Sequence, residues 1–157
     1  MNALSALRNQ VYKNIDQFPN RRFFTPVDEF WKVLSDLPKD LNLIECGSGM
    51  GDLLTEAVEH GIRLGGVDPI WREGQHIAVH KMDAMQLTWS SERWPLICRP
   101  DHSGWAQDVI VRAKQHGATT LFVGLPSNYR WDLQHFFTKA HPRIVGAEGE
   151  KLYWIKP

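Results

Sequence analysis

The chain has 157 residues, a mass of 18.1 kDa, and eighteen basic residues balanced by eighteen acidic ones. This length fits one core, so we expect a single domain over residues 1–157. The charge balance gives no whole-molecule argument for nucleic acid or an anionic membrane as a partner. No apolar run approaches the roughly 20 residues that a membrane-spanning helix needs. Two cysteines are too few for a disulfide framework, so we expect a cytoplasmic protein.

Residues 1–40 are predicted to form two helices, because their apolar residues recur three and four positions apart. The apolar stripe of the first helix runs from Leu4 to Phe18. The second helix is predicted to begin at Thr25, with Pro26 in its first turn, and to end before Pro38.

From residue 41 onwards, short apolar strands alternate with helical stretches. Strands are predicted at 41–46, 62–67, 76–81, 95–98 and 119–123. Helices are predicted from 53 to near Gly61, from 105 to Gly117, and over 133–140. The last two apolar segments, 143–147 and 152–155, predict a terminal hairpin. This order predicts an α/β fold, in which residues 41–157 form a doubly wound, mostly parallel seven-stranded sheet with helices on both faces and an antiparallel C-terminal hairpin.

A glycine-rich turn lies between the first strand and the helix after it, in Glu45-Cys46-Gly47-Ser48-Gly49-Met50-Gly51-Asp52. Such a turn lets the backbone approach a ligand closely. A dinucleotide-binding turn would have glycine in place of Asp52, and a P-loop would continue with Gly-Lys-Ser/Thr, so neither motif is present. The carboxylates of Glu45 and Asp52 would repel phosphates. The turn therefore favours a ligand that carries a cationic amine.

Further carboxylates follow the next two strands. Asp68 ends the second strand, where an acidic residue can accept hydrogen bonds from both ribose hydroxyls. Asp83 ends the third, with Ala84 and Met85 beside it, and can accept a hydrogen bond from an adenine amine. Together these residues describe a site for a ribosylated adenine with a cationic amino-acid tail and no phosphate. S-adenosylmethionine has this chemistry.

These motifs resemble the class I S-adenosylmethionine (SAM)-dependent methyltransferase family, over residues 41–157 and including the terminal hairpin. The resemblance implies SAM as the cofactor and methyl transfer as the activity. By resemblance, Glu45 and the glycine turn hold the methionine part, Asp68 the ribose, and Asp83 with Ala84 the adenine. The implied cofactor-binding residues are Glu45, Gly47, Ser48, Gly49, Gly51, Asp68, Pro69, Ile70, Asp83, Ala84 and Arg99. The alternative is a doubly wound domain whose glycine turn only packs a helix on a strand.

The methyl acceptor of this family usually lies past the fourth strand, where this chain reads Arg99-Pro100-Asp101-His102-Ser103-Gly104-Trp105. The motifs of exocyclic-amine and cytosine-carbon methyltransferases are missing, which disfavours common nucleic-acid base chemistries. Asp101 and His102 are candidate catalytic residues, because an imidazole can act as general base for an oxygen or nitrogen nucleophile. Ser103 can instead cap the next helix and leave the pair in a solvated turn. The acceptor stays open.

Four tryptophans each follow a predicted strand: Trp71, Trp89, Trp105 and Trp131. They are expected near the carboxyl edge of the sheet, where they can stack on a planar acceptor or anchor a protein partner. A second hypothesis follows, in which the chain is a non-catalytic, methyltransferase-like binding module that acts through a protein partner. His76 and His80 have the ligand spacing of a helix but lie in a predicted strand, so no metal site is predicted.

Overall fold

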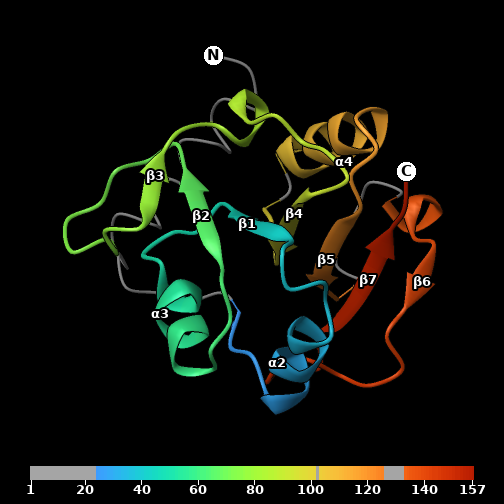
Figure 1. The fold of residues 1–157 in the computed structure, drawn as a ribbon, viewed down its shortest axis with the longest axis horizontal. Coiled ribbons are helices and arrows are strands. Elements are labelled where there is room, and N and C mark those ends of the chain that lie inside the picture. Colours follow the sequence, from blue (N-terminus) through green and yellow to red (C-terminus); the bar gives the residue numbers. More distant parts are fainter. Residues whose placement is uncertain (1–23, 102, 126–132) are drawn as a thin grey trace.

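A computed structural model of the chain describes residues 24–101, 103–125 and 133–157, so the predicted first helix lies outside the described residues. Figure 1 shows a central sheet with helices on both sides. The strands are β1 (Asn42–Cys46), β2 (Gly65–Asp68), β3 (Val79–Lys81), β4 (Arg93–Cys98), β5 (Thr120–Gly124), β6 (Lys139–Ala140) and β7 (Lys151–Ile155).

The strand order is β3-β2-β1-β4-β5-β7-β6. The pairs from β3 through β5 are parallel, whereas β7 is antiparallel to both β5 and β6. This arrangement confirms the predicted seven-stranded, mostly parallel sheet with an antiparallel C-terminal pair. It also brings the carboxyl ends of β1, β2, β3 and β4 to one edge of the sheet. The predicted ligand residues lie at or just after these ends.

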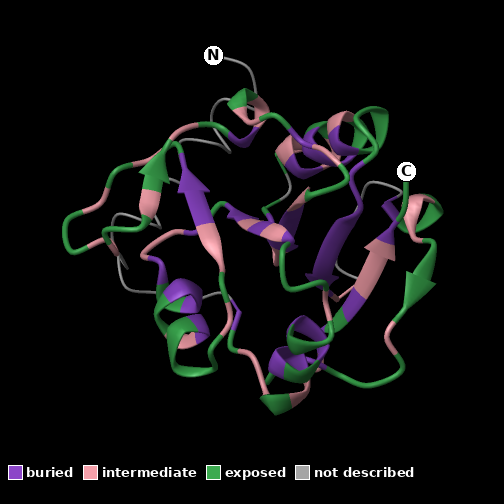
Figure 2. Ribbon diagram, viewed as in Figure 1, coloured by how far each residue is buried: buried purple, intermediate pink, exposed green. Residues whose placement is uncertain are grey.

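Helices α2 (Asp28–Ser35) and α3 (Asp52–Glu59) pack on one face of the sheet, and α4 (Trp105–Gln115) packs on the other. Successive side chains of a strand point to opposite faces of the sheet, so apolar residues of one strand contribute to both cores. In β4, Leu96 belongs to the core beneath α2 and α3, and its neighbour Ile97 belongs to the core beneath α4. Figure 2 shows the burial concentrated in the central strands and on the inward sides of the helices. No helix of the described residues is both long and apolar enough to cross a membrane.

The second helix begins later than its sequence predicts, at Asp28 instead of Thr25. Val27 N donates a hydrogen bond to Val145 O at 2.9 Å, and Ala147 N donates one to Thr25 O at 2.9 Å. The segment around Pro26 therefore runs alongside residues 145–147 and cannot also be helical.

The partner of the last strand also differs from the prediction. Residues 143–147 do not pair with β7. Besides β5, β7 pairs with β6, which falls inside the predicted helix 133–140. Only Leu133–Phe136 is helical there, as a 3₁₀ turn (η3). Hydrogen bonds to β7 hold the rest extended, since Thr138 N donates to Trp154 O and His141 N to Leu152 O, both at 2.8 Å. The competing contacts are long-range, which explains why the helical spacing misleads.

An ion pair fastens α2 to the end of β6. His141 Nε2 lies 2.8 Å from Glu29 Oε1, and Arg143 Nη1 lies 3.8 Å from Glu29 Oε2. The hydrogen bond with His141, aided by the charges of Arg143, His141 and Lys32, outweighs desolvation and lowers the pKa of Glu29 from its ordinary value of 4.5.

Because the pKa of Glu29 is lower in the folded state, its ionised form stabilises the fold above the unfolded pKa, and this contribution is lost as pH falls through the folded pKa. We expect Glu29→Gln to lower the free energy of unfolding at neutral pH and the two proteins to converge as pH falls through the folded pKa of Glu29. Urea unfolding of both proteins across this range measures the difference. A gap that stays constant with pH would contradict the assignment.

Candidate functional site

The glycine loop (residues 47–51) joins β1 to α3 in a conformation that side chains rarely adopt. Gly47, Gly49 and Gly51 have φ values of 75°, 58° and 83°. In this left-handed region a residue with a Cβ is strained, whereas glycine is not. The glycine spacing noted in the sequence is therefore required by the turn itself.

Four N–H groups of the glycine loop, those of Gly47, Ser48, Gly49 and Gly51, are bonded within the protein. Gly47 N and Ser48 N both donate to Val67 O, at 2.9 and 3.1 Å, and Gly51 N donates to Ser48 O at 3.0 Å. The Ser48 hydroxyl donates to Glu45 O at 3.0 Å. The loop is thus closed onto the ends of β1 and β2, and these N–H groups do not form an anion cradle.

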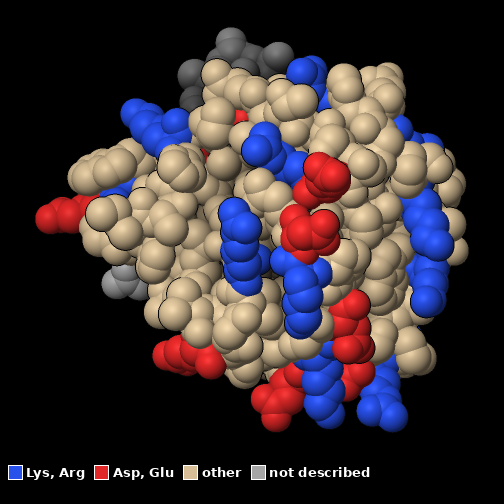
Figure 3. All heavy atoms as spheres, in the orientation of Figure 1, with Lys and Arg blue, Asp and Glu red and all other residues tan. Residues whose placement is uncertain are grey.

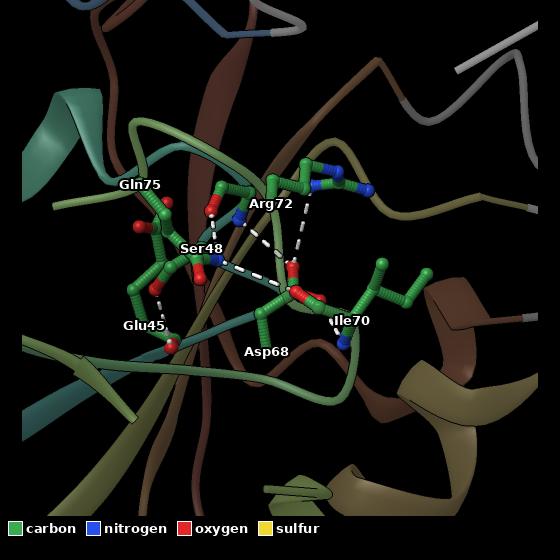
Figure 4. A network of polar contacts seen from close by, with 7 residues as sticks. Glu45, Ser48, Asp68, Ile70, Arg72 and Gln75 are labelled. Atoms are coloured by element: carbon green, nitrogen blue, oxygen red, sulfur yellow. Dashed lines mark hydrogen bonds and ion pairs between the residues drawn. The ribbon is translucent and has the colours of Figure 1, made fainter. Parts of the chain in front are cut away.

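Asp68, the last residue of β2, completes this closure. Its Oδ2 accepts a hydrogen bond from Gly49 N at 2.8 Å, and its Oδ1 accepts one from Ile70 N at 2.8 Å. Arg72 Nη1 lies 3.8 Å from Oδ2. Figure 4 shows Asp68 at the centre of this network, although only 6% of its surface is exposed. The structure thus joins Asp68 to the glycine loop and adds Arg72, which the sequence analysis did not single out. The contact of Asp68 with a ribose stays a prediction.

The connection between β2 and β3 (residues 69–78), here called the strap, contacts the glycine loop a second time. Gln75 Nε2 donates to Gly49 O at 2.6 Å and is 3.4 Å from Ile70 O. His76 N donates to Met50 O at 2.9 Å. Sequence reasoning missed Gln75. The only signal was the short distance between the two predicted strands, which leaves little room for a helix.

Asp83, which follows β3, caps a short helical turn. Asp83 Oδ1 accepts a hydrogen bond from Met85 N at 2.8 Å, and Asp83 N donates to Gln86 Oε1 at 3.0 Å. This capping box starts the 3₁₀ turn η1 (Ala84–Gln86). Asp83 is exposed and Ala84 is buried, so the carboxylate faces solvent with an apolar residue beside it.

The Cys46 thiol is buried at the end of β1, close to two of the predicted carboxylates. Burial raises the pKa of Cys46 well above 9.0, and the charges of Glu45 and then Asp83 raise it further. Glu45 is itself buried, with 7% of its surface exposed. Cys46 therefore stays protonated near neutral pH and is no nucleophile.

Arg99 was predicted to bind the cofactor, and the structure pairs its side chain with two carboxylates next to β7. Its Nη1 lies 2.6 Å from Glu148 Oε2 and 3.5 Å from Glu150 Oε2. Both carboxylates precede β7, which pairs with β5, whereas the glycine loop follows β1 on the other side of β4. Arg99 has a φ of 48°, in the left-handed region that residues other than glycine seldom adopt.

The predicted catalytic pair is described only in part, because His102 lies outside the described residues. Asp101 is exposed, and its Oδ1 accepts hydrogen bonds from Ser103 N and the Ser103 hydroxyl. Ser103 does not cap α4, whose N-cap is Gly104 with a φ of 88°. Asp101 thus shapes the turn that leads into α4.

The four tryptophans do not share one environment. Trp89 has 1% of its surface exposed and belongs to the core beneath α4, so its indole is not available to an acceptor or a partner. Trp71 is 65% exposed and lies on the strap. Trp105 packs against the loop: a Cβ added to Gly47 would lie 3.3 Å from its ring. Trp131 lies outside the described residues.

A surface hollow of about 230 Å³ opens beside the strap, lined by Met50, Asp52, Thr55, Gly74 and His76. Asp68 and Asp83 are not part of its lining, so this hollow differs from the predicted nucleoside site. Figure 3 shows one face of the molecule, on which acidic and basic side chains alternate without a broad basic area. Among the residues that the structure describes, no three His, Cys, Asp or Glu side chains are grouped to hold a metal ion.

No protein-family model and no curated protein match the chain. Solved structures match it. Magnesium protoporphyrin IX methyltransferase from Synechocystis PCC 6803, solved with bound SAM, aligns over 100% of this chain and 85% of its own, with a TM-score of 0.54 and 11% identity. Mitomycin 7-O-methyltransferase aligns over 82% of this chain and 52% of its own, with a TM-score of 0.54 and 12% identity.

The chain has the class I methyltransferase fold. It matches about half the length of the mitomycin enzyme. At identities of 11% and 12%, these matches show a shared fold but not shared side chains. The roles of individual residues therefore rest on the geometry described above.

Gly66 gives a test of how tightly the loop is closed. A Cβ at this position of β2 would clash with Ser48 Oγ and lie 3.0 Å from Leu54 Cδ1. We expect Gly66→Ala to lower the free energy of unfolding by about 1–3 kcal/mol through overpacking. Removing the hydroxyl with Ser48→Ala should recover part of this loss, so the double variant is more stable than the sum of the single effects. Urea unfolding of the four proteins measures the coupling, and strict additivity would show that Ser48 does not close on Gly66.

Proposed function

We propose that the chain binds SAM and transfers its methyl group to an oxygen or nitrogen nucleophile. One observation carries the proposal: a glycine loop that uses four of its N–H groups for hydrogen bonds inside the protein lies beside two buried carboxylates, Glu45 and Asp68. The fold shared with SAM-dependent methyltransferases supports it.

The loop is poorly suited to a phosphorylated ligand. Phosphate sites in α/β folds use backbone N–H groups at a glycine turn and a helix N-terminus. Here Gly47, Ser48, Gly49 and Gly51 already donate to partners in the chain. Negative charge from Glu45 and Asp68 would add repulsion. A ligand that brings hydrogen-bond donors and positive charge avoids both costs.

The same residues suit the adenosyl and amino-acid parts of SAM. Each oxygen of Asp68 accepts one hydrogen bond in the structure, and a carboxylate has about four acceptor sites, so two remain for ribose hydroxyls. Glu45 and the loop would hold the cationic amino-acid tail. Asp83 and Ala84, at the end of the neighbouring strand, would receive the adenine with one polar and one apolar contact.

When bound, SAM supplies a methyl group on an electrophilic sulfonium. The chain would then contribute mainly by positioning, because oriented reactants can gain several kcal/mol without a strong base. Asp101 and His102 are the proposed proton acceptors, and Trp105, which packs against Gly47, is placed to contact an acceptor there.

Calorimetry with S-adenosylhomocysteine (SAH) and its 2′-deoxy and 3′-deoxy forms tests the ribose assignment without altering the protein. A lost hydrogen bond to a carboxylate costs about 1.5–3 kcal/mol. We therefore expect each deoxy ligand to bind about 10- to 150-fold more weakly.

The control is Asp68→Asn, checked by its melting temperature for a folded state. In this variant the penalty for the deoxy ligands should shrink, because the charged acceptor is gone. Equal affinity of wild type for SAH and both deoxy forms would contradict the role of Asp68. No binding of SAM or SAH would overturn the proposed function.

A second candidate function is the non-catalytic module that acts through a protein partner. It is favoured by two large apolar side chains on the strap, Trp71 and Ile77, which are 65% and 96% exposed. Absence of methyl transfer by a protein that still binds SAM would favour this candidate.

A further inference from the structure

The strap differs from the usual way of joining parallel strands. Such connections commonly contain a helix that packs on the sheet. Residues 69–78 contain none, and they lead directly from β2 to the edge strand β3. Instead of covering the sheet, the strap reaches back to the glycine loop through Gln75 and His76. These polar contacts therefore hold the strap against the glycine loop.

Gln75 makes the contact that bears most directly on the site. Its amide donates to Gly49 O at 2.6 Å, while Gly49 N donates to Asp68 Oδ2 at 2.8 Å. Both peptide groups of one residue are thus held, one by the strap and one by the end of β2. Figure 4 shows Gln75 on one side of the loop and Asp68 on the other.

This double hold matters because glycine does not hold its own conformation. Gly49 has a φ of 58°, and glycine populates positive and negative φ about equally well. If the carbonyl were released, φ and ψ of Gly49 would be freer to change, and the preceding peptide group, which carries the Gly49 N–H, could shift away from Asp68. The Asp68 carboxylate would then lose one of the two hydrogen bonds that orient it.

We propose that Gln75 is a positioning residue for the nucleoside site: it holds the Gly49 carbonyl and thereby the backbone conformation at Gly49 that directs the Gly49 N–H to Asp68, which orients the carboxylate toward the ribose. This inference rests on the proposed function, since it assigns a role within the same site. It also predicts a property of the ligand-free protein, namely that the Gly49 N–H is protected from solvent exchange.

The first test compares Gln75→Leu with Gln115→Leu, an exposed glutamine on α4 that serves as the matched control. A net hydrogen bond of about 1–2 kcal/mol corresponds to a factor of about 5–30. We expect Gln75→Leu to bind SAH about 5- to 30-fold more weakly and to exchange the Gly49 amide hydrogen faster by a similar factor. The control should change neither quantity.

The second test uses Gln75→Glu, which keeps the length of the side chain. The protonated carboxyl can donate to Gly49 O, whereas the ionised carboxylate cannot donate and repels the carbonyl. SAH affinity of this variant should therefore recover relative to wild type as pH falls from about 7 to about 4, through the ordinary pKa of a glutamate of about 4.3. A merely structural glutamine would produce no such pH-dependent rescue.

The outcomes separate the two proposals. If wild type binds SAH, and Gln75→Leu binds it within about twofold while Gln75→Glu shows no gain at low pH, the positioning role is overturned and the proposed function stands. If wild type binds neither SAM nor SAH, the proposed function fails. In that case amide exchange in the ligand-free protein decides on Gln75, and unchanged exchange of Gly49 in Gln75→Leu overturns its role.

Discussion

The hydrogen bond from Gly49 N to Asp68 holds the two halves of the site together. It joins the loop after β1 to the end of β2, and at 2.8 Å it is a short bond to a carboxylate that is 6% exposed. Burying such a charge is costly unless donors surround it. Gly49, Ile70 and Arg72 supply this compensation. The loop is therefore closed by the same residue that we assign to the ribose.

The internal hydrogen bonds of the glycine loop affect which ligand it can bind. An N–H group that donates within the protein cannot also donate to a phosphate, so each contact that closes the loop removes part of an anion site. The pairs from Gly47 and Ser48 to Val67 O act in this way, as does the bond from Gly49 to Asp68. With the buried charge of Glu45 nearby, the closed loop favours a nucleoside that brings donors and positive charge.

The sequence predicts the elements whose contacts are local or repetitive. The central strands β1, β4 and β5 carry unbroken or alternating apolar residues, and the glycine spacing of the loop answers a backbone that only glycine adopts easily. Asp68 could be paired with the loop because the carboxyl ends of adjacent parallel strands meet at one edge. These features need no knowledge of distant partners.

The remaining features depend on contacts between distant segments, and the sequence could not show them. The stripe through Phe136 and Ala140 has helical spacing, yet hydrogen bonds to β7 hold its second half extended. Arg99 follows the expected strand, but carboxylates near β7 draw its side chain across β5. Gln75 stands in a polar stretch without a motif, and only the folded strap brings it to Gly49.

A crystal structure of the chain with bound SAH tests the central claim most directly. The account predicts the adenosine ribose beside Asp68, with its hydroxyls donating to the carboxylate while the bond from Gly49 persists. A nucleoside bound elsewhere, or a phosphorylated nucleotide held by the N–H groups of an opened glycine loop, would contradict it.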